Sequence, residues 1–199
     1  MFTDIDIGYS TMSIEERPDL IKESDRGAVI VGAALLDSAL ENYLRDVFTM
    51  HRVSKKNVDA MFDLSGPLSS FSSKSLICYG FRMITKDIFD DLSVIRRLRN
   101  RFAHSTADVD FSSEDIASIV KKLKCTKSAQ DHFTKTYSSL TEEEIVEWNS
   151  SSEGNIKYAK AIFCLGVQCL EIEILECCTN FIREESSFSV YKQGRMRGT

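Results

Sequence analysis

Residues 24–51 read SDRGAVIVGAALLDSALENYLRDVFTMH, and their apolar side chains recur at alternating steps of four and three. The members of this stripe are Val29, Ala33, Leu36, Leu40, Tyr43 and Val47. Such spacing places the side chains on one side of an α-helix, where they can be buried together. The stretch therefore predicts a long central helix from Ser24 to His51.

Helical patterns also flank this stretch on both sides. Pro18 suits the first turn of a short helix ending near Lys22. The turn-rich run from Leu64 to Ser72 predicts a loop whose serines cap a helix running to about Met83. A further helix is expected from Lys86 to His104, with Ile88, Leu92, Ile95, Leu98 and Phe102 facing inward.

Three more helices are expected in the second half of the chain. Ser112 and Asp115 indicate the start of a helix that ends near Lys124, and Thr141 with Glu144 forms a capping-box pattern for a short one. A last long helix should bury a stripe made of Tyr158, Ile162, Leu165, Cys169, Ile172 and Thr179. Together these patterns predict a bundle of helices.

Composition supports one all-α domain. The chain has 199 residues, of which 43% are hydrophobic, so it can bury a sizeable core without needing a second domain. Its two prolines and nine glycines leave long stretches free to run as helices. We expect a single multi-helix bundle over residues 1–185 and a flexible C-terminal tail over residues 186–199, where no apolar period continues.

The net charge and the cysteine content of the chain indicate the cellular compartment in which the protein works. The formal charge of -5 repels phosphate backbones and anionic membranes from the chain as a whole, so any nucleic-acid contact must use a local patch. The first ten residues have neither a basic nor an apolar signal region, and no stretch is apolar enough to span a membrane. We expect a cytoplasmic protein whose six cysteines are reduced and mostly packed in the core.

The run IRRLRNRFAH at residues 95–104 is the main candidate for chemistry. Its arginines follow an acidic start to the same helix, which is also how a solvated helix complements its own dipole. Arg99 falls on the inward-facing register, so it should sit beside the core and need a partner there. Asp37 and Glu41 on the central helix are the expected structural partners of Arg99.

A ligand could be held on the outer side of this helix. Asn100 and His104 are four residues apart, and Arg96 extends their row by one turn. If the ligand is a phosphodiester, a neutral His104 could take a proton from a ribose hydroxyl while Arg99 steadies charge on phosphorus. The alternative for His104 is a C-terminal helix cap.

Three segments together resemble the mannitol operon repressor family. They are residues 24–37, the run Gly66-Pro-Leu-Ser-Ser-Phe-Ser-Ser-Lys74, and residues 95–104. The resemblance spans about residues 24 to 105 and implies an all-helical fold. It also implies a role in regulating transcription of mannitol uptake genes without a recognised DNA-binding motif, and hence through a protein partner.

The pattern of Arg99, Asn100 and His104 also resembles the signature of HEPN domains, helical bundles that include metal-independent ribonucleases. In those domains the motif lines a cleft between two subunits, so the resemblance implies a homodimer. By this carry-over Arg99 would hold phosphate, Asn100 would orient it, and His104 would be the catalytic acid or base.

Three functions therefore remain open. The first is a non-enzymatic regulator acting through a protein partner; direct DNA binding is disfavoured because the arginine helix opens with three aspartates. The second is a HEPN-type ribonuclease or RNA-binding module. The third is a bundle that binds a small anion through Arg96, Asn100 and Lys74. No cofactor or metal is expected, because the three histidines are scattered and no metal-ligand motif occurs.

Overall fold

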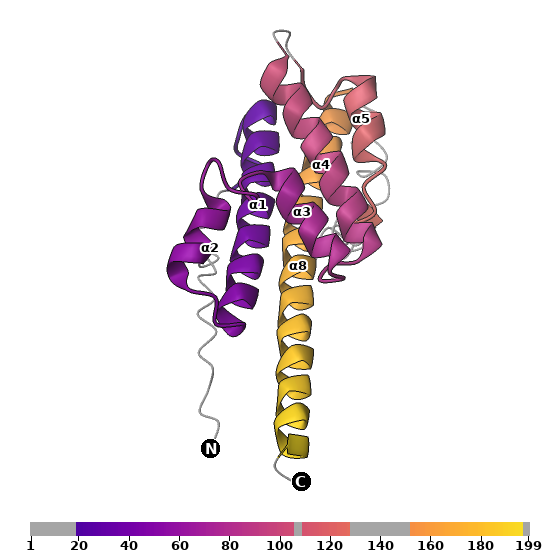
Figure 1. Cartoon of the computed structure of the whole chain (residues 1–199). Coiled ribbons are helices and arrows are strands. Elements are labelled where there is room, and N and C mark those ends of the chain that lie inside the picture. Colours follow the sequence, from indigo (N-terminus) through magenta and orange to yellow (C-terminus); the bar gives the residue numbers. More distant parts are fainter. Residues whose placement is uncertain (1–18, 106–108, 128–151, 197–199) are drawn as a thin grey trace.

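The computed structural model describes residues 19–105, 109–127 and 152–196, and the secondary structure in these ranges is helical without any strand. The helices are α1 (Asp25–Met50), α2 (Lys55–Phe62), α3 (Phe71–Gly80), α4 (Lys86–His104), α5 (Glu114–Val120) and α8 (Ser152–Met196). They pack as a bundle, with α1, α4 and α8 as its long members (Figure 1). The all-α prediction is confirmed.

Helix α1 is the centre of the bundle, as its sequence predicts. It starts where the Ser24 hydroxyl accepts a hydrogen bond from the Gly27 amide and ends at Met50. All six members of the predicted stripe are buried. By length and composition α1 could also cross a membrane. The sequence was expected to contain no such stretch. The buried apolar side chains of α1 pack against α8, α4 and α3.

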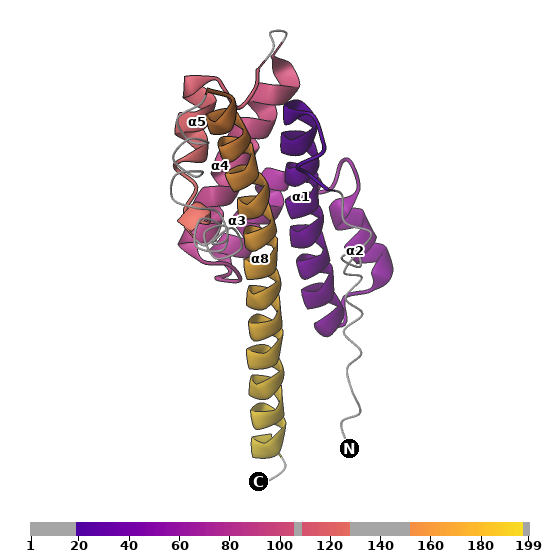
Figure 2. The same cartoon turned by 180° about the vertical axis from the view of Figure 1, so that it is seen from behind.

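Helix α8 runs beside α1 in the same direction (Figures 1 and 2). Near the start of both helices the Lys160 ammonium lies 3.3 Å from the Asp25 carboxylate. Further along, a Cβ on Gly32 would lie only 3.3 Å from Val167, so glycine permits the close approach of the two helices. Near the other end the Tyr43 hydroxyl donates to a carbonyl oxygen of α8 at 3.2 Å.

The buried stripe of α8 differs from the predicted one. The side chains that point into the core include Phe163, Val167, Leu170, Ile174, Cys178 and Ile182. Of the predicted members, Ile162 is buried, but Ile172 is exposed. The prediction failed because α8 is apolar on more than one side, and the four-three period alone does not choose between two neighbouring stripes.

Helix α4 runs opposite to α1 and buries its predicted side. Ile88, Leu92, Ile95, Leu98 and Phe102 are all buried, which confirms the expected inward face. At its C-terminal end the Phe102 ring packs against Phe111, which in turn contacts Phe163 of α8. This aromatic cluster joins three segments that are far apart in the sequence.

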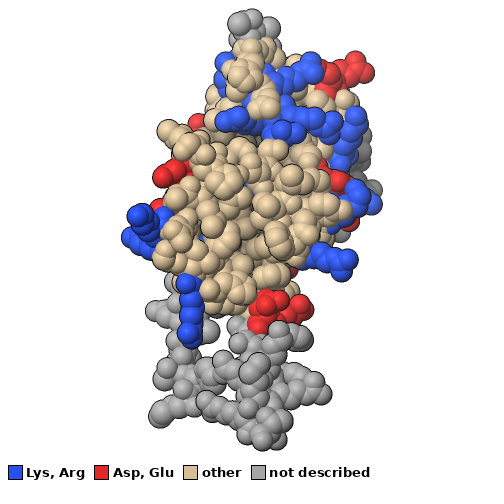
Figure 3. Space-filling model, in the orientation of Figure 1, with Lys and Arg blue, Asp and Glu red and all other residues tan. Residues whose placement is uncertain are grey.

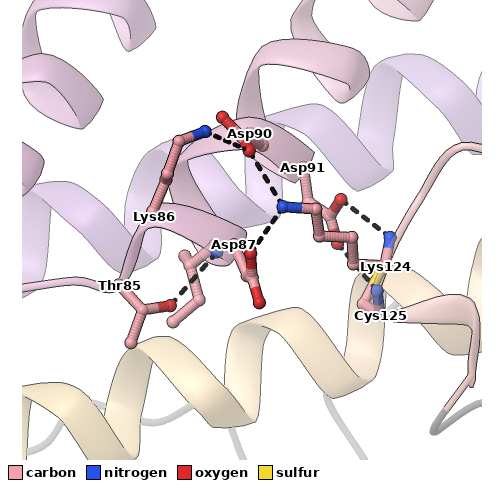
Figure 4. A network of polar contacts seen from close by, with 8 residues as sticks. Thr85, Lys86, Asp87, Asp90, Asp91, Lys124 and Cys125 are labelled. Atoms are coloured by element: carbon pink, nitrogen blue, oxygen red, sulfur yellow. Dashed lines mark hydrogen bonds and ion pairs between the residues drawn. The ribbon is translucent and has the colours of Figure 1, made fainter.

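The acidic N-terminal end of α4 is occupied by contacts within the chain (Figure 4). Buried Asp91 accepts the backbone N–H groups of Lys124 and Cys125 at 2.8 and 2.7 Å. The Lys124 ammonium lies 2.5 Å from Asp87 and 2.9 Å from Asp90. These contacts fasten the segment after α5 to α4, so the aspartates serve the fold.

Several smaller predictions are corrected. The short helix expected to end near Lys22 is only a turn over residues 20–22 within the described range, and α2 lies where no helix was expected. Helix α3 ends at Gly80 rather than near Met83, and α5 spans only Glu114–Val120. The helix expected at Thr141 and Glu144 lies outside the described residues.

The end of the chain is helical for longer than the sequence suggested. Helix α8 continues to Met196, past the boundary expected at residue 185. The division into a domain and a flexible tail stays a prediction.

The cysteines are packed as expected. Cys78, Cys125, Cys164 and Cys178 are buried, and Cys169 and Cys177 are partly buried. Burial raises the pKa of the Cys78 and Cys164 thiols to about 12, so both stay protonated at neutral pH. Such thiols act as small apolar core groups.

Candidate functional site

The C-terminal end of α4 exposes a cluster of positive charge. Arg96, Arg97, Arg99 and Arg101 are exposed, and we call them the arginine end of α4. Figure 3 shows Lys and Arg atoms gathered over this part of the molecule. Arg101 forms an ion pair with Asp115 of α5. Among the described residues, no carboxylate lies within ion-pair distance of the other three guanidinium groups.

Arg99 does not have the partner that its register suggested. Its guanidinium is exposed and donates to the Asn100 side-chain oxygen at 3.1 Å. Asp37 and Glu41 instead face Lys74, whose ammonium lies 2.8 and 3.0 Å from their carboxylates. The prediction that these acids pair with Arg99 is wrong. A long arginine at the edge of the buried side can turn outward to solvent. Lys74 is instead buried against the two carboxylates.

Lys74 is a structural residue of the bundle. It is only 3% exposed, and its ammonium reaches Asp37 and Glu41 on α1. Burial tends to raise the pKa of Glu41, but hydrogen bonds from Lys74 and Arg45 outweigh it and lower that pKa. The Asp37 oxygen contacts the ammonium at ion-pair distance without hydrogen-bond alignment. The Lys74 ammonium is therefore buried and engaged by two carboxylates, whereas Arg96 and Asn100, with which a small-anion site would have to combine it, are exposed.

The predicted row on α4 does reach the surface. Arg96, Asn100 and His104 are all exposed, and their spacing of four residues puts them on one side of the helix. His104 is the last residue of α4, and the cap is the following residue, Ser105, whose carbonyl oxygen accepts a hydrogen bond from Arg26 at 3.0 Å. The three side chains thus stand in the open at one end of the bundle.

Helix α3 presents an uncharged surface next to this end. Ser72, Leu76, Tyr79 and Gly80 share one exposed side of the helix, and Phe81 follows at its end; we call these five residues the α3 face. Leu76 is 59% exposed and Phe81 is 66% exposed. Large apolar side chains that gather on a surface often mark a binding site.

The α3 face has no charge because of the sequence that builds it. Between Leu64 and Phe81 the only charged residue is Lys74, and that residue is buried. Figure 3 shows the result as a broad region of uncharged atoms below the arginine end. In a chain in which 28% of residues are charged, an exposed stretch of this kind is unusual. We therefore take it as part of the candidate site.

The loop before α3 is held rigidly in place. The Leu68 amide donates to the Met61 carbonyl oxygen at 2.8 Å. A Cβ on Gly66 would lie 2.4 Å from that same oxygen, so only glycine fits there. The Ser70 hydroxyl then accepts from the Ser73 amide and starts α3. The predicted loop and serine cap are confirmed.

An aromatic pair joins the α3 face to α4. The rings of Tyr79 and Phe89 stack with centroids 4.5 Å apart and planes 13° apart. Phe89 lies on the same side of α4 as Arg96 and Asn100, at steps of seven and four. Phe89 lies near the start of α4, and the row that it begins runs along this side of the helix to Arg96, seven residues later.

The residue after the α3 face has an unusual backbone. Arg82 has a φ of 58°, in the left-handed region that favours glycine. Its amide and the next one bond back to Tyr79 and Cys78, which closes the end of α3. An arginine at a helix end where glycine would fit better adds a charge at the border of the α3 face.

Sequence reasoning found the arginine end but missed the α3 face. The signal was present, because the long run without an exposed charge from Leu64 to Phe81 can be read directly from the sequence. Its turn residues and serines predict only a loop and a helix cap. In the part of the chain that the structure covers, no group of His, Cys, Asp and Glu side chains is arranged to hold a metal ion.

Comparison with known proteins identifies the family. No curated protein matches the chain in sequence. The fold matches a chain of the X-ray structure of the MtlR-HPr complex from Escherichia coli with a TM-score of 0.52 and 18% identity, over 78% of this chain and 91% of that one. The family model described as mannitol repressor matches residues 19–171, which is more than half of the sequence. The chain therefore belongs to the mannitol repressor family.

Proposed function

We propose that this protein is a transcription regulator that acts by binding a protein partner through the α3 face. The observation that carries the proposal is the exposure of Leu76, Tyr79 and Phe81 on a surface without charge. Family membership supports a regulatory role. The solved complex of a similar fold contains HPr, so HPr is the first partner to test, and we place the interaction in the cytoplasm.

Direct DNA binding is not part of the proposal. The first turns of a recognition helix must be free to meet bases and phosphates. Helix α4 carries the arginines, but its first turns hold Asp87, Asp90 and Asp91, which are engaged with Lys124 and its backbone. The other long helices offer no comparable cluster of exposed arginines in the described residues.

The test combines binding with regulation. Purified protein is titrated calorimetrically with HPr from the same organism, and a reporter of mannitol uptake genes is measured in cells that carry each variant. Leu76→Asp should abolish both binding and regulation, because it places a charge in the centre of the apolar contact. Ile172→Asp is the matched control, since Ile172 is an apolar residue on α8 that is also exposed, at 49% against 59% for Leu76.

Two outcomes would contradict the proposal, one for its first named partner and one for its surface. If wild-type protein releases no heat with HPr, HPr is not the partner. If Leu76→Asp and Ile172→Asp regulate the reporter as well as the wild type does, the α3 face is not the regulatory surface.

A ribonuclease or RNA-binding module is the second candidate, and the exposure of one α4 row favours it. Arg96, Asn100 and His104 are open to solvent together, and Arg99 orients the Asn100 amide through its hydrogen bond. In this function Arg99 holds phosphate and His104 acts as acid or base. A homodimer would be needed to enclose the row in a cleft.

Purified protein should then cut RNA without added metal, and His104→Ala should abolish cutting. His51→Ala is the control, because His51 is also exposed but lies at the opposite end of α1. Equal cutting by both variants would reject the ribonuclease, and light scattering would show whether a dimer exists.

A further inference from the structure

The α3 face and the arginine end of α4 form one composite surface. Phe89, Arg96 and Asn100 follow one another along one side of α4, and the stacked Tyr79 ring ties the first of them to α3. An apolar region therefore passes into a positively charged one without an intervening acidic residue on this row. Figure 3 shows both regions on the same side of the molecule.

Some of the charged groups around this surface have an ion-pair partner and others have none among the described residues. Arg96, Arg97 and Arg99 have no carboxylate at ion-pair distance within the described ranges. By contrast, the carboxylates of Asp37 and Glu41 beneath α3 are engaged by Lys74. The three arginines beside the apolar centre are thus available to a partner, whereas the two nearby carboxylates are already paired within the chain.

We propose that the composite surface binds a protein segment in which apolar residues are bordered by carboxylates. The inference rests on the proposed function and specifies the chemistry of its partner. Charge complementarity selects this occupant over a second copy of the chain. A second copy docked symmetrically through the same surface would bring its own exposed arginines against these, and like charges repel each other.

The two regions contribute differently to binding. Burial of Leu76 and Phe81 removes apolar surface from water and holds the complex together. The exposed arginines attract the acidic border before contact, which raises the association rate and makes it depend on salt. Screening over about 10 Å at moderate ionic strength should remove most of that attraction.

The experiment selects short random peptides, displayed on phage, against the immobilised full-length protein. Peptides recovered on the wild type should combine large apolar residues with Asp or Glu. One representative peptide is then synthesised together with a version in which Lys replaces its acidic residues. The Lys version should bind about tenfold more weakly or worse.

Protein variants separate the two regions. Leu76→Asp should lose the selected peptide altogether. Arg96→Glu with Arg97→Glu should slow association about tenfold at low salt and remove most of its salt dependence. Lys55→Glu with Lys56→Glu is the matched double charge reversal, because both residues are exposed cations at the start of α2, near the opposite end of α1. It should leave association unchanged.

Three results would overturn the inference. One is a set of selected peptides without acidic residues, and another is equal recovery on wild type and Leu76→Asp. The third is a wild-type dimer that Leu76→Asp converts to a monomer, which would assign the surface to a second copy. A failure to bind HPr would count against the proposed function alone, since the peptide selection does not use HPr.

Discussion

The two ends of helix α4 carry opposite charges and have opposite uses. At the N-terminal end Asp87, Asp90 and Asp91 are bound by Lys124 and by backbone amides. At the C-terminal end Arg96 and Arg97 project into solvent. The same helix dipole favours both arrangements, so charge placement alone does not distinguish them. The contacts within the fold distinguish the two ends. They indicate that the acidic end stabilises the bundle and that the basic end is available for binding.

The largest expected effect is at the buried carboxylate. Asp91→Ala would leave the amides of Lys124 and Cys125 without an acceptor in a site that is only 2% exposed. We expect a loss of about 2 to 4 kcal/mol in the free energy of unfolding. Urea unfolding followed by circular dichroism measures it. A loss of less than about 0.5 kcal/mol, which is what we expect for Arg97→Ala at the other end of the helix, would contradict the assigned difference between the two ends.

The next effect concerns the exposed part of the acidic end. Hydrogen bonds from Lys86 and Lys124 lower the pKa of Asp90, so this contact stabilises the fold at neutral pH. Lys124→Gln should lower the melting temperature, and added salt should reduce the difference. The difference should vanish as the pH falls through the lowered pKa of Asp90. A difference that persists in acid would show that Lys124 acts through packing.

Glu173 of α8 gives a further test, because it lies near the acidic end of α4 and feels the charges of Asp91 and Asp87. Burial raises its pKa, and the charges of Asp91 and Glu176 raise it further. Its ionised form is therefore unfavourable in the folded state. Glu173→Gln should increase the free energy of unfolding by about 0.3 to 1 kcal/mol at neutral pH.

This gain should be complete above the raised pKa and should disappear below the ordinary pKa of glutamate, where the wild-type side chain is protonated in both states. Thermal unfolding across pH measures it. A gain that does not change with pH would point to a cause other than charge.

The smallest expected effect on stability is at the basic end. Arg96→Ala and Arg97→Ala should change the free energy of unfolding by less than about 0.5 kcal/mol, since both side chains are exposed and lack an ion-pair partner among the described residues. The same variants should weaken binding of an acidic partner. Calorimetric unfolding and titration measure the two properties separately. A marked loss of stability would assign these arginines to the fold.

Much of the fold could be predicted because its key helices have a single apolar stripe. The stripe on α1 and that on α4 were each predicted residue by residue and are buried. The buried stripe on α8 was not predicted correctly. That helix is apolar on several sides, and the helices packed against it determine which side is buried. Helix α2 was missed, since its eight residues bury only Val58 and give no clear period.

The candidate site could be predicted only in part. Local spacing correctly grouped Arg96, Asn100 and His104 on one exposed row. It wrongly assigned Asp37 and Glu41 to Arg99, because spacing along α1 cannot say which cation another helix brings to those carboxylates. In the structure Lys74 of α3 pairs with both carboxylates in place of Arg99.

The amino-acid pattern alone predicts the all-helical fold, the residues of the two main apolar stripes and the concentration of arginines toward one end of α4. These properties depend on the period of side chains along one helix, which is local. The tertiary structure alone decided which charges are neutralised and that an uncharged α3 face lies beside the free arginines. Those properties depend on contacts between segments such as α3 and α1, which no single stretch of sequence contains.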